Sequence, residues 1–451
     1  MKTKIKWVSV RELLFLGLLV LYPFRHMFMG VDLMDSGYNC ANFTYSGTEY
    51  MDSMWFFATW SANMFGSFLT KLPWGDTLAG MNFYTILPVS GMVLLCYFFA
   101  TRKMHIPSGI AFFGEMLAIS LCWLPTTALY TYLTYFLLGA AVILLYQGLT
   151  VEKNLYLVLA GVCLGLNISV RFSNLPQAAL IVAVWYYCLI NRKGFKELLR
   201  ITGVCLAGYL GAVLVFLTVV ALVYGPNEYI AGISRLFAMT EYATDYSSQS
   251  MLKGMIGGYL EISYFLKRCI LAGGFSFLVC MLFPGKFLRV KKVITVLCML
   301  VLLWWFHKSG FYSLDTASYY SIYQPCILLL LMAMGLSAFV MIDKKTEPSV
   351  KLRSLLIICL ILLTSLGSNN AIFSSINNLF FVMPVFLGLT YDFLKSKEHI
   401  LFFPFKAILI AVILLVSVQT AGFGWRYVYE EADGARDLSA RITEIPVLKG
   451  I

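Results

Sequence analysis

Long runs of apolar residues, separated by short polar segments, follow one another along nearly the whole chain. Apolar runs of roughly 20 residues are the pattern of helices that cross a membrane. The sequence therefore predicts an all-α fold, a polytopic transmembrane helix bundle with about 13 spans. The predicted spans are 11–30, 80–100, 106–124, 127–149, 154–170, 175–191, 201–224, 266–284, 292–306, 321–342, 354–368, 377–393 and 401–424.

Three connections between these spans are longer than a turn: 31–79, 225–265 and 307–320. The stretch DSMWFFATWSANMFGSFLTK at 52–71 mixes aromatic and polar residues, and EYIAGISRLFAMTEYATDY at 228–246 does the same. Such mixtures are typical of helices that lie in the membrane interface, with aromatic rings at the level of the lipid headgroups. We therefore expect interfacial helices in the first and second outer loops.

Two domains are expected from this organisation. Residues 1–425 form the membrane domain, with 31–79 as the first and 225–265 as the second large outer loop. Residues 426–451 form a short extracytoplasmic tail, which is too short to build a hydrophobic core of its own.

Composition and charge support a membrane protein and exclude a soluble enzyme. The chain is 60% hydrophobic and only 13% charged, and its net charge is +11. With the amino terminus inside, the cytoplasmic segments hold 22 cations and seven acids, and the outer segments hold 12 cations and 15 acids. Because an excess of Lys and Arg marks the cytoplasmic side, most of the charge reflects orientation, and no nucleic-acid partner is needed. We expect a multi-pass protein of a bacterial plasma membrane, with the carboxyl terminus outside.

The sequence lacks the common motifs for nucleotide binding, metal binding and serine-hydrolase catalysis. The sequence contains no GxxxxGK[ST], HExxH, CxxC or GxSxG motif and only four histidines. It therefore predicts no ATP-binding loop, no metal site and no serine-hydrolase elbow. No cofactor is expected.

The segment just after the first span carries two carboxylates, Asp32 and Asp35, in VDLMDSGYNCANF. Residues three apart share one face of a helical turn, and two close carboxylates near lipid raise the pKa of at least one of them. Such a group can act as a general base toward a hydroxyl, and Tyr38 adds an aromatic wall beside it. On composition alone, a solvated turn with an Asp helix cap is the favoured interpretation of the same residues.

Basic residues at the outer ends of the spans are the second feature of interest. They are Arg25, His26, Arg171, Lys267, Arg268, His307 and Lys308. Charges near lipid are costly and are often kept for function, although each of these side chains could simply extend to the headgroups. Together they indicate a pocket for a phosphate or pyrophosphate, which the forked guanidinium of Arg binds well.

Polar residues near the same face are predicted to contact a sugar or an acceptor. Glu115 lies in the middle of its span, where a neutral, hydrogen-bonded carboxyl is expected rather than a catalytic one. The predicted contact residues are Tyr38, Asn174, Asn369, Asn370, His307 and Asp315.

These features resemble those of GT-C-type glycosyltransferases, in particular the bacterial relatives of aminoarabinose transferases and protein O-mannosyltransferases. The first span leads into an outer loop with an Asp motif, DSGY, and GLNISVRFSN ends a span in an outer Arg. The chain differs from many members in having Asp-Ser in place of Asp-Glu and in lacking a large C-terminal outer domain.

The resemblance implies a membrane glycosyltransferase whose co-substrate is a polyprenyl-phosphate sugar. It implies Asp35 as the catalytic base, with Asp32 as second choice, and Arg171 near the donor phosphate, assisted by Lys267, Arg268 and Arg25. Transfer to a glycan, lipid or protein acceptor outside the membrane would then invert the anomeric centre without a metal ion.

Three alternatives remain open. A transporter or flippase of lipid-linked sugars would also be a bundle with a basic inner side, and it would place charges at mid-membrane depth. A polysaccharide polymerase or ligase would use the later outer loops, with Arg235, Asp245 or Asp315. A non-catalytic scaffold is compatible with the same sequence.

Overall fold

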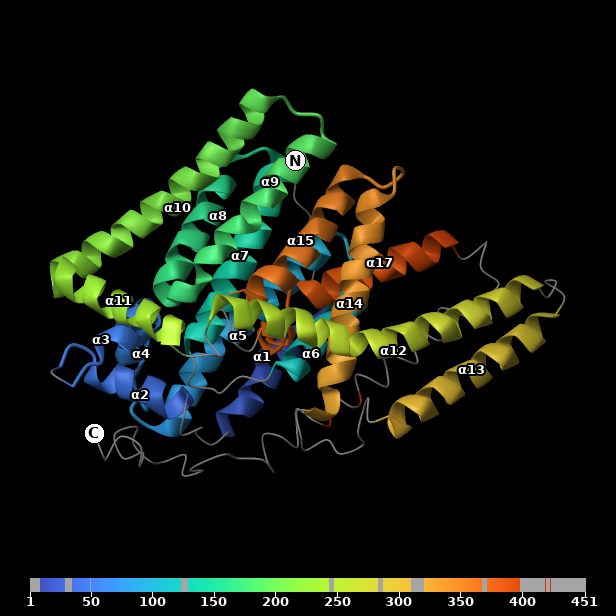
Figure 1. Cartoon of the computed structure of the whole chain (residues 1–451), viewed down its shortest axis with the longest axis horizontal. Helices are drawn as coiled ribbons and strands as arrows, with labels where there is room; N and C mark the ends of the chain where they lie inside the picture. Colours follow the sequence, from blue (N-terminus) through green and yellow to red (C-terminus); the bar gives the residue numbers. More distant parts are fainter. Residues whose placement is uncertain are drawn as a thin grey trace.

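A computed structural model shows the chain as a bundle of α-helices (Figure 1). It describes residues 9–28, 35–48, 50–122, 129–242, 247–282, 287–309, 320–366 and 371–397, together with Val418 and Gly422. The elements are α1 (Val10–Leu21), η1 (Tyr22–Phe28), α2 (Asp35–Tyr45), α3 (Ser53–Ala58), α4 (Trp60–Leu69), α5 (Leu78–Arg102), α6 (Ser108–Leu121), α7 (Leu129–Val151), α8 (Asn154–Val170), η2 (Phe172–Ile181), α9 (Val182–Ile190), α10 (Phe195–Tyr224), α11 (Pro226–Tyr242), α12 (Ser248–Leu282), α13 (Leu288–Lys308), α14 (Tyr320–Ile342), α15 (Pro348–Ser365), α16 (Ala371–Asn377) and α17 (Val382–Lys397).

The protein is an all-α, multi-pass membrane helix bundle. Within the described residues, seven helices are long and apolar enough to cross a membrane, and three shorter apolar helices accompany them. The predicted class is therefore confirmed, whereas the count of about 13 spans is not reached. The first predicted span, 11–30, is divided into the short helix α1 and the 3-10 turn η1, and nearly all of 401–424 lies outside the described residues.

Close helix packing in the bundle depends on small residues. The pattern Gly161-xxx-Gly165 on α8 faces Gly208-xxx-Ala212 on α10, and a Cβ atom added at Gly161 would clash with the backbone oxygen of Cys205. Small residues four apart allow two helix backbones to approach each other in membranes, where dispersion contacts replace hydrophobic collapse. These glycines therefore determine how α8 and α10 meet.

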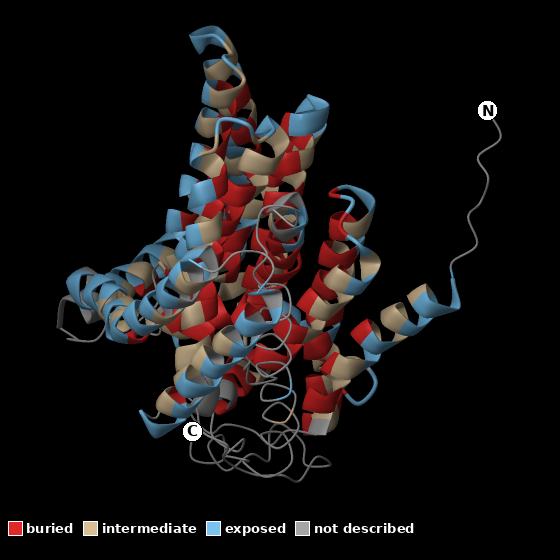
Figure 2. Ribbon diagram, turned by 90° about the vertical axis from the view of Figure 1, so that its right-hand side faces the viewer, coloured by how far each residue is buried: buried red, intermediate tan, exposed pale blue. Residues whose placement is uncertain are grey.

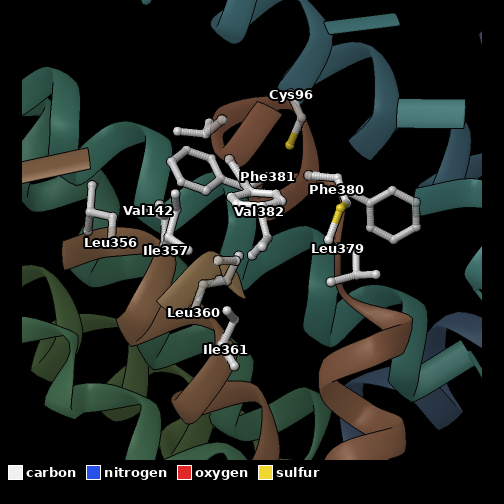
Figure 3. Packing of buried hydrophobic residues seen from close by; sticks show 14 of the residues in the cluster. Cys96, Val142, Leu356, Ile357, Leu360, Ile361, Leu379, Phe380, Phe381 and Val382 are labelled. Carbon is white, nitrogen blue, oxygen red and sulfur yellow. The ribbon is translucent and has the colours of Figure 1, made fainter. Parts of the chain in front are cut away.

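Large apolar side chains fill the middle of the bundle. Figure 2 shows the buried residues inside the group of helices, with exposed residues at helix ends and along the projecting helices. In the close view, side chains of α7 and α15, Val142 and Ile357 among them, gather with Cys96 of α5 around the segment Leu379–Val382 that leads into α17 (Figure 3). This core holds the later helices against α5 and α7.

Short helices form a layer at one end of the bundle. The helices α2, α3 and α4 lie together with α11 at the lower left of Figure 1, where α10 ends. The stretch 52–71, predicted as one interfacial helix, is two helices with a break at Thr59. We call α2, α3, α4 and α11 the outer layer, after the orientation that the charge pattern predicts.

The second large outer loop differs from the prediction. The segment 225–265 contains α11 and the first part of α12, a single helix that continues to Leu282. Lys267 and Arg268 consequently lie within α12, although an apolar helix was predicted to begin there. The polar first half of the segment is helical because its apolar residues recur at helical spacing.

Candidate functional site

A helix break places Arg171 at the carboxyl-terminal end of α8. The helix ends at Val170, Arg171 takes an extended conformation with φ −152° and ψ 120°, and η2 begins at Phe172. The Arg171 N–H donates to the Asn167 carbonyl at 3.1 Å, and the Asn174 N–H donates to the Arg171 carbonyl at 2.9 Å. Both backbone groups of Arg171 are thus satisfied within the break.

Buried side-chain amides stabilise this break. The Asn174 amide donates to Thr134 Oγ1 at 2.8 Å and to the Asn167 carbonyl at 2.9 Å, and the Asn167 amide donates to Gln177 Oε1 at 2.7 Å. Gln177 in turn donates to Asn174 Oδ1 at 3.2 Å. Because unpaired amides are costly in a low-dielectric interior, the closed network ties α7, α8 and η2 together. Asn174, a predicted sugar contact, is only 5% exposed and belongs to this network.

The Arg171 side chain lies beside aromatic rings and is partly exposed. Its guanidinium carbon is 5.3 Å from the ring centre of Tyr130 on α7. No hydrogen bond or ion pair to the guanidinium is found among the residues that the structure describes. A guanidinium stacked on an aromatic face, without a carboxylate partner, retains its donors for an anionic ligand.

The helix α2 begins at Asp35, the predicted catalytic base. The side chains of Asp35 and Ser36 and the whole of Asp32 lie outside the described residues. Further along α2, the ring of Phe43 packs so closely on Gly66 of α4 that a Cβ atom there would clash with it. The C-terminal half of α2 is therefore packed on α4.

Tyr38 connects α2 to α3. Its ring meets the edge of Trp55 at 5.8 Å, and its hydroxyl is hydrogen-bonded to Asp52. Burial, together with the Asp52 carboxylate, raises the pKa of Tyr38 above its ordinary value. Asp52 also accepts from the Met54 N–H at 2.9 Å as the N-cap of α3. The phenol consequently stays neutral and helps to fix the two helices.

The outer layer is joined to the helix that carries Arg171. Ser61 of α4 and Ser169 of α8 share a hydrogen bond of 2.6 Å, two residues before Arg171. On the other side, Phe237 of α11 meets the edge of Phe172 at 5.7 Å. The outer layer thus contacts the chain on both sides of Arg171. Neither contact could be predicted from the sequence, because both join segments far apart in the chain.

Arg25 has a different environment from Arg171. It is 5% exposed, and its guanidinium donates to the Ile119 carbonyl at 3.0 Å and stacks at 4.1 Å on the ring of Tyr22. Ile119 lies in the last turn of α6, where unpaired carbonyls favour a cation. Arg25 therefore caps α6 in this structure, and its predicted contact with a phosphate remains a prediction.

A small cavity adjoins this cap. It is lined by Pro23 and the buried His26, by Ile119 and Cys122 at the end of α6, and by residues of the two neighbouring helices. Its walls are mostly apolar, so we assign no ligand to it. The residues from the neighbouring helices are Ile86, Val89 and Tyr132.

The remaining predicted residues are elsewhere or outside the described chain. Lys267 and Arg268 are exposed on α12, and His307 is exposed near the end of α13. Asn369, Asn370 and Asp315 lie outside the described residues. Among the described residues, no group of three or more His, Cys, Asp or Glu is placed to hold a metal ion.

Glu115 of α6 is fully buried. Neither carboxyl oxygen has a hydrogen-bond partner within the described part of the chain. The predicted hydrogen bond of this carboxyl is therefore not found there.

Comparison with solved structures finds a distant likeness in fold. The sequence matches no protein-family model and no curated protein sequence. The fold is similar to the archaeal oligosaccharyltransferase AglB from Archaeoglobus fulgidus, solved in complex with an inhibitory peptide and a dolichol-phosphate, at 11% sequence identity and a TM-score of 0.47. The match covers 94% of this chain and 56% of that chain, so this chain spans little more than half the length of the archaeal protein.

Proposed function

We propose that this protein is a GT-C-like membrane glycosyltransferase that moves a sugar from a polyprenyl-phosphate donor to an acceptor outside the membrane. The observation that carries the proposal is the environment of Arg171. Its guanidinium has no ion-pair partner among the described residues, and a buried amide network holds the helix break at which the residue lies. A preorganised cation at the membrane boundary suits a lipid-linked phosphate. The acceptor is a cell-envelope glycan, a lipid or a protein.

The packing of the outer layer is the evidence that supports Asp35 as the second catalytic group. The helix that begins at Asp35 packs on α4, and α4 is hydrogen-bonded to α8 close to Arg171. This chain of contacts connects the acidic motif to the cation through two helices. It supports Asp35 as general base, with Asp32 as second choice.

The reaction follows from these two groups. Asp35 takes the proton of the acceptor hydroxyl while the hydroxyl oxygen forms a bond to the anomeric carbon. The bond from that carbon to the phosphate oxygen breaks, and the polyprenyl phosphate leaves with the electron pair. Arg171 stabilises the negative charge that develops on the leaving oxygen. Attack from the face opposite the leaving group inverts the configuration.

Sugar transfer in membranes tests this proposal. We expect Asp35→Asn to lower turnover about 10²-fold or more, because positioned general bases contribute about 10²–10⁴-fold. Arg171→Ala should lower it strongly, and Arg171→Lys less so, because Lys keeps the charge but loses the forked donor geometry. Lys71→Ala, an exposed outer cation in the first loop, serves as the matched control.

The assay uses defined polyprenyl-phosphate sugars and equal amounts of folded protein. Normal turnover in both Asp35→Asn and Arg171→Ala would contradict the proposal. A loss in Asp32→Asn with normal turnover in Asp35→Asn would transfer the role of the base to Asp32.

A transporter or flippase of lipid-linked sugars is the second candidate, and Glu115 favours it. Its carboxyl is buried in a membrane helix without a hydrogen-bond partner in the described chain, and intramembrane carboxyls often serve ion or substrate pathways. Movement of a labelled lipid-linked sugar across vesicles, compared between the wild type and Glu115→Gln, tests this function. Unchanged movement in the variant would remove the support from Glu115.

A further inference from the structure

The first turn of α1 is bonded to both ends of the connection between α5 and α6. Arg102, at the end of α5, forms an ion pair with Glu12 of α1 at 2.8 Å. Arg11 of α1 donates to the hydroxyl of Ser108, the first residue of α6, at 3.2 Å. These two contacts bring the connection 103–107 beside the start of α1.

Contacts further along the helices show in which direction each one runs from this point. The ring of Phe15, early in α1, stacks on that of Phe112, early in α6, at 4.1 Å, so these two helices run in the same direction. Ser90 of α5 donates to the Val20 carbonyl of α1 at 3.3 Å, so α5 runs in the opposite direction. The start of α1, the end of α5 and the start of α6 therefore meet at one end of the bundle, which the charge pattern predicts to be cytoplasmic.

The connection between α5 and α6 presents two more basic side chains. Met104 and Ile106 are only 7% and 5% exposed and anchor the connection to the bundle. Lys103 and His105 alternate with them and are exposed. His105 lies in the left-handed region, with φ 57°, a conformation that His adopts more readily than most residues. The connection is thus an anchored turn that exposes its basic residues. We call Arg11, Arg102, Lys103 and His105 the basic cluster.

The basic cluster has an excess of positive charge. Glu12 pairs with Arg102, whereas neither Arg11 nor Lys103 forms an ion pair with a described residue. No side chain caps the start of α6, so the positive end of that helix dipole adds to the same field. Because like charges repel one another, an external anion stabilises this arrangement.

A buried hydroxyl without a partner lies beside the basic cluster. Tyr97 of α5 is fully buried, and its hydroxyl has no hydrogen-bond partner within the described chain. Three charged groups of the adjoining helix ends, Arg11, Glu12 and Arg102, interact with it electrostatically. A buried polar group without a partner is costly. This hydroxyl is therefore an available donor for an oxygen atom held beside Arg11.

The face of α1 that carries Arg11 is otherwise apolar. Leu14, Leu18 and Leu21 follow Arg11 at helical spacing, and they are 62%, 50% and 67% exposed. They extend from Arg11 away from the predicted cytoplasmic end. On a membrane-spanning bundle such a surface contacts lipid chains, and a cation at its end lies at the level of the headgroups.

We infer that Arg11 and Lys103, together with His105, bind the phosphate of an anionic glycerophospholipid in the inner leaflet, and that the acyl chains lie along Leu14 and Leu18. A lipid fits better than free phosphate, because the cation and the exposed leucines share one face of α1. The bound lipid joins α1 to the turn between α5 and α6. The site lies at the opposite end of the bundle from the outer layer and does not depend on sugar transfer.

Lipid retention by the purified full-length protein tests this inference. The protein is reconstituted into phosphatidylcholine bilayers that contain a minor fraction of phosphatidylglycerol and is then re-extracted, and the lipid that stays bound is measured by mass spectrometry. The double variant Arg11→Gln, Lys103→Gln should bind phosphatidylglycerol about tenfold more weakly, since each basic residue near anionic lipid strengthens binding severalfold. Unchanged retention in this variant would overturn the site.

The double variant Lys344→Gln, Lys345→Gln is the matched control. Both lysines are exposed in the loop between α14 and α15, on the same predicted side of the membrane. This variant loses the same charge and keeps the basic cluster, so it should retain as much phosphatidylglycerol as the wild type. An equal loss in the two double variants would indicate general attraction to a basic surface and would overturn a defined site.

Competition identifies the source of the phosphate. Phosphatidylglycerol should be retained better than phosphatidylcholine, and inorganic phosphate at equal concentration should not displace it. Displacement by inorganic phosphate, or equal retention of the two lipids, would overturn the assignment to an anionic phospholipid.

A single variant and a second measurement cover the case in which the double variant does not fold. Lys103→Gln breaks no ion pair within the described chain and should weaken retention by itself. Phosphatidylglycerol should raise the thermal midpoint of the wild type in detergent more than that of Lys103→Gln, because a ligand that binds only the folded state stabilises it. Equal retention and equal midpoint shifts in the two proteins would overturn the site. The proposed sugar transfer uses none of these residues, so a failure here leaves that proposal intact.

Discussion

At the scale of single residues, Arg25 and Arg171 show why position alone does not define a ligand-binding cation. Both lie at outer ends of predicted spans, and both were expected to contact a phosphate. Arg25 is buried against the final carbonyls of α6, whereas Arg171 is partly exposed and stacks on Tyr130 without an ion partner among described residues. Their different surroundings come from contacts with other helices.

The amide of Asn174 provides a prediction about the break that holds Arg171. Asn174→Ala removes its hydrogen bonds to Thr134 and Asn167 and deprives the buried Gln177 amide of its acceptor, Asn174 Oδ1. We expect a loss of about 1–3 kcal/mol of stability, together with reduced sugar transfer, because Arg171 loses its fixed position. Thermal unfolding in detergent measures the first effect.

Asn154→Ala is the matched control for this variant. Asn154 accepts one exposed hydrogen bond from Arg200, so its replacement should change stability little. Equal stability of the Asn174 and Asn154 variants would show that the amide network does not support the break.

The Glu152–Lys193 pair gives a prediction about pH. Lys193 donates to Glu152 at 2.7 Å and holds the pKa of that carboxyl below its ordinary value. A lowered folded-state pKa contributes stability above the ordinary pKa of Glu, and this contribution is lost as the pH falls through the lowered value. The thermal midpoints of the wild type and Glu152→Gln should therefore differ at neutral pH and converge in acid.

Glu347→Gln serves as the control for this titration. Glu347 is exposed and has no ion-pair partner within the described chain, so its replacement removes no ion pair and should lower the thermal midpoint at neutral pH less than Glu152→Gln does. A constant offset between wild type and Glu152→Gln down to strongly acidic pH would contradict the prediction.

At the scale of elements, glycine spacing determines how α8 and α10 pack. A Cβ atom at Gly208 would clash with the backbone oxygen of Val158, and no atom lies within 4 Å of a Cβ atom at Gly211. Gly208→Ala should cost about 1–3 kcal/mol, because backbone atoms cannot move aside without separating the helices. Gly211→Ala should be neutral or slightly stabilising, since Ala favours a helix over Gly.

Thermal unfolding of the two variants in the same detergent gives a direct comparison on one helix. A larger loss at Gly211 than at Gly208 would show that the two helices do not meet at this face in the membrane.

Helix boundaries show the limit of prediction from apolar runs. The break at Thr59 divides 52–71 into α3 and α4, and the Asn63 amide donates across it to the Phe56 carbonyl at 3.1 Å. The apolar pattern is continuous there, so only this local hydrogen bond and the packing on neighbouring helices reveal the break. The position of Lys267 and Arg268 inside α12 was equally invisible in the apolar runs, because the rings that stabilise Arg268 come from two helices.

At the scale of the whole molecule, the orientation in the membrane is a prediction of the charge pattern. The loops after α9 and α14 lie at one end of the bundle in Figure 1, and the outer layer lies at the other. The first end carries Lys193 and Lys345, as the cytoplasmic side should. We therefore expect Lys345→Cys to react with a membrane-impermeant maleimide only after the cells are opened.

Lys71→Cys is the complementary variant, because Lys71 is exposed next to the outer layer. It should react in intact cells. The nine cysteines whose side chains the structure describes are buried or half-buried, so these should add little background. The opposite labelling pattern would reverse the orientation.

The membrane bundle and much of the helical pattern were predictable from the sequence. In lipid every backbone group must be hydrogen-bonded internally, so a run of apolar residues is sufficient to specify a helix. The acidic motif after the first span and the Arg after GLNISV could also be found, since both are local. Asn174 was found as a polar residue, but its role was not, because its partner Thr134 lies 40 residues away in the chain.

The sequence by itself determined the class of protein, the inner excess of positive charge and the candidate residues Asp35 and Arg171. Tertiary structure alone decided that the guanidinium of Arg25 donates a hydrogen bond within the fold, to the Ile119 carbonyl. It likewise decided that the guanidinium of Arg171 has no ion-pair partner among the described residues. It also decided that α4 and α11 contact the chain beside Arg171, through Ser61 and Phe237. The physical reason is that hydropathy acts locally along the chain, whereas hydrogen bonding and charge neutralisation depend on which distant residues pack together.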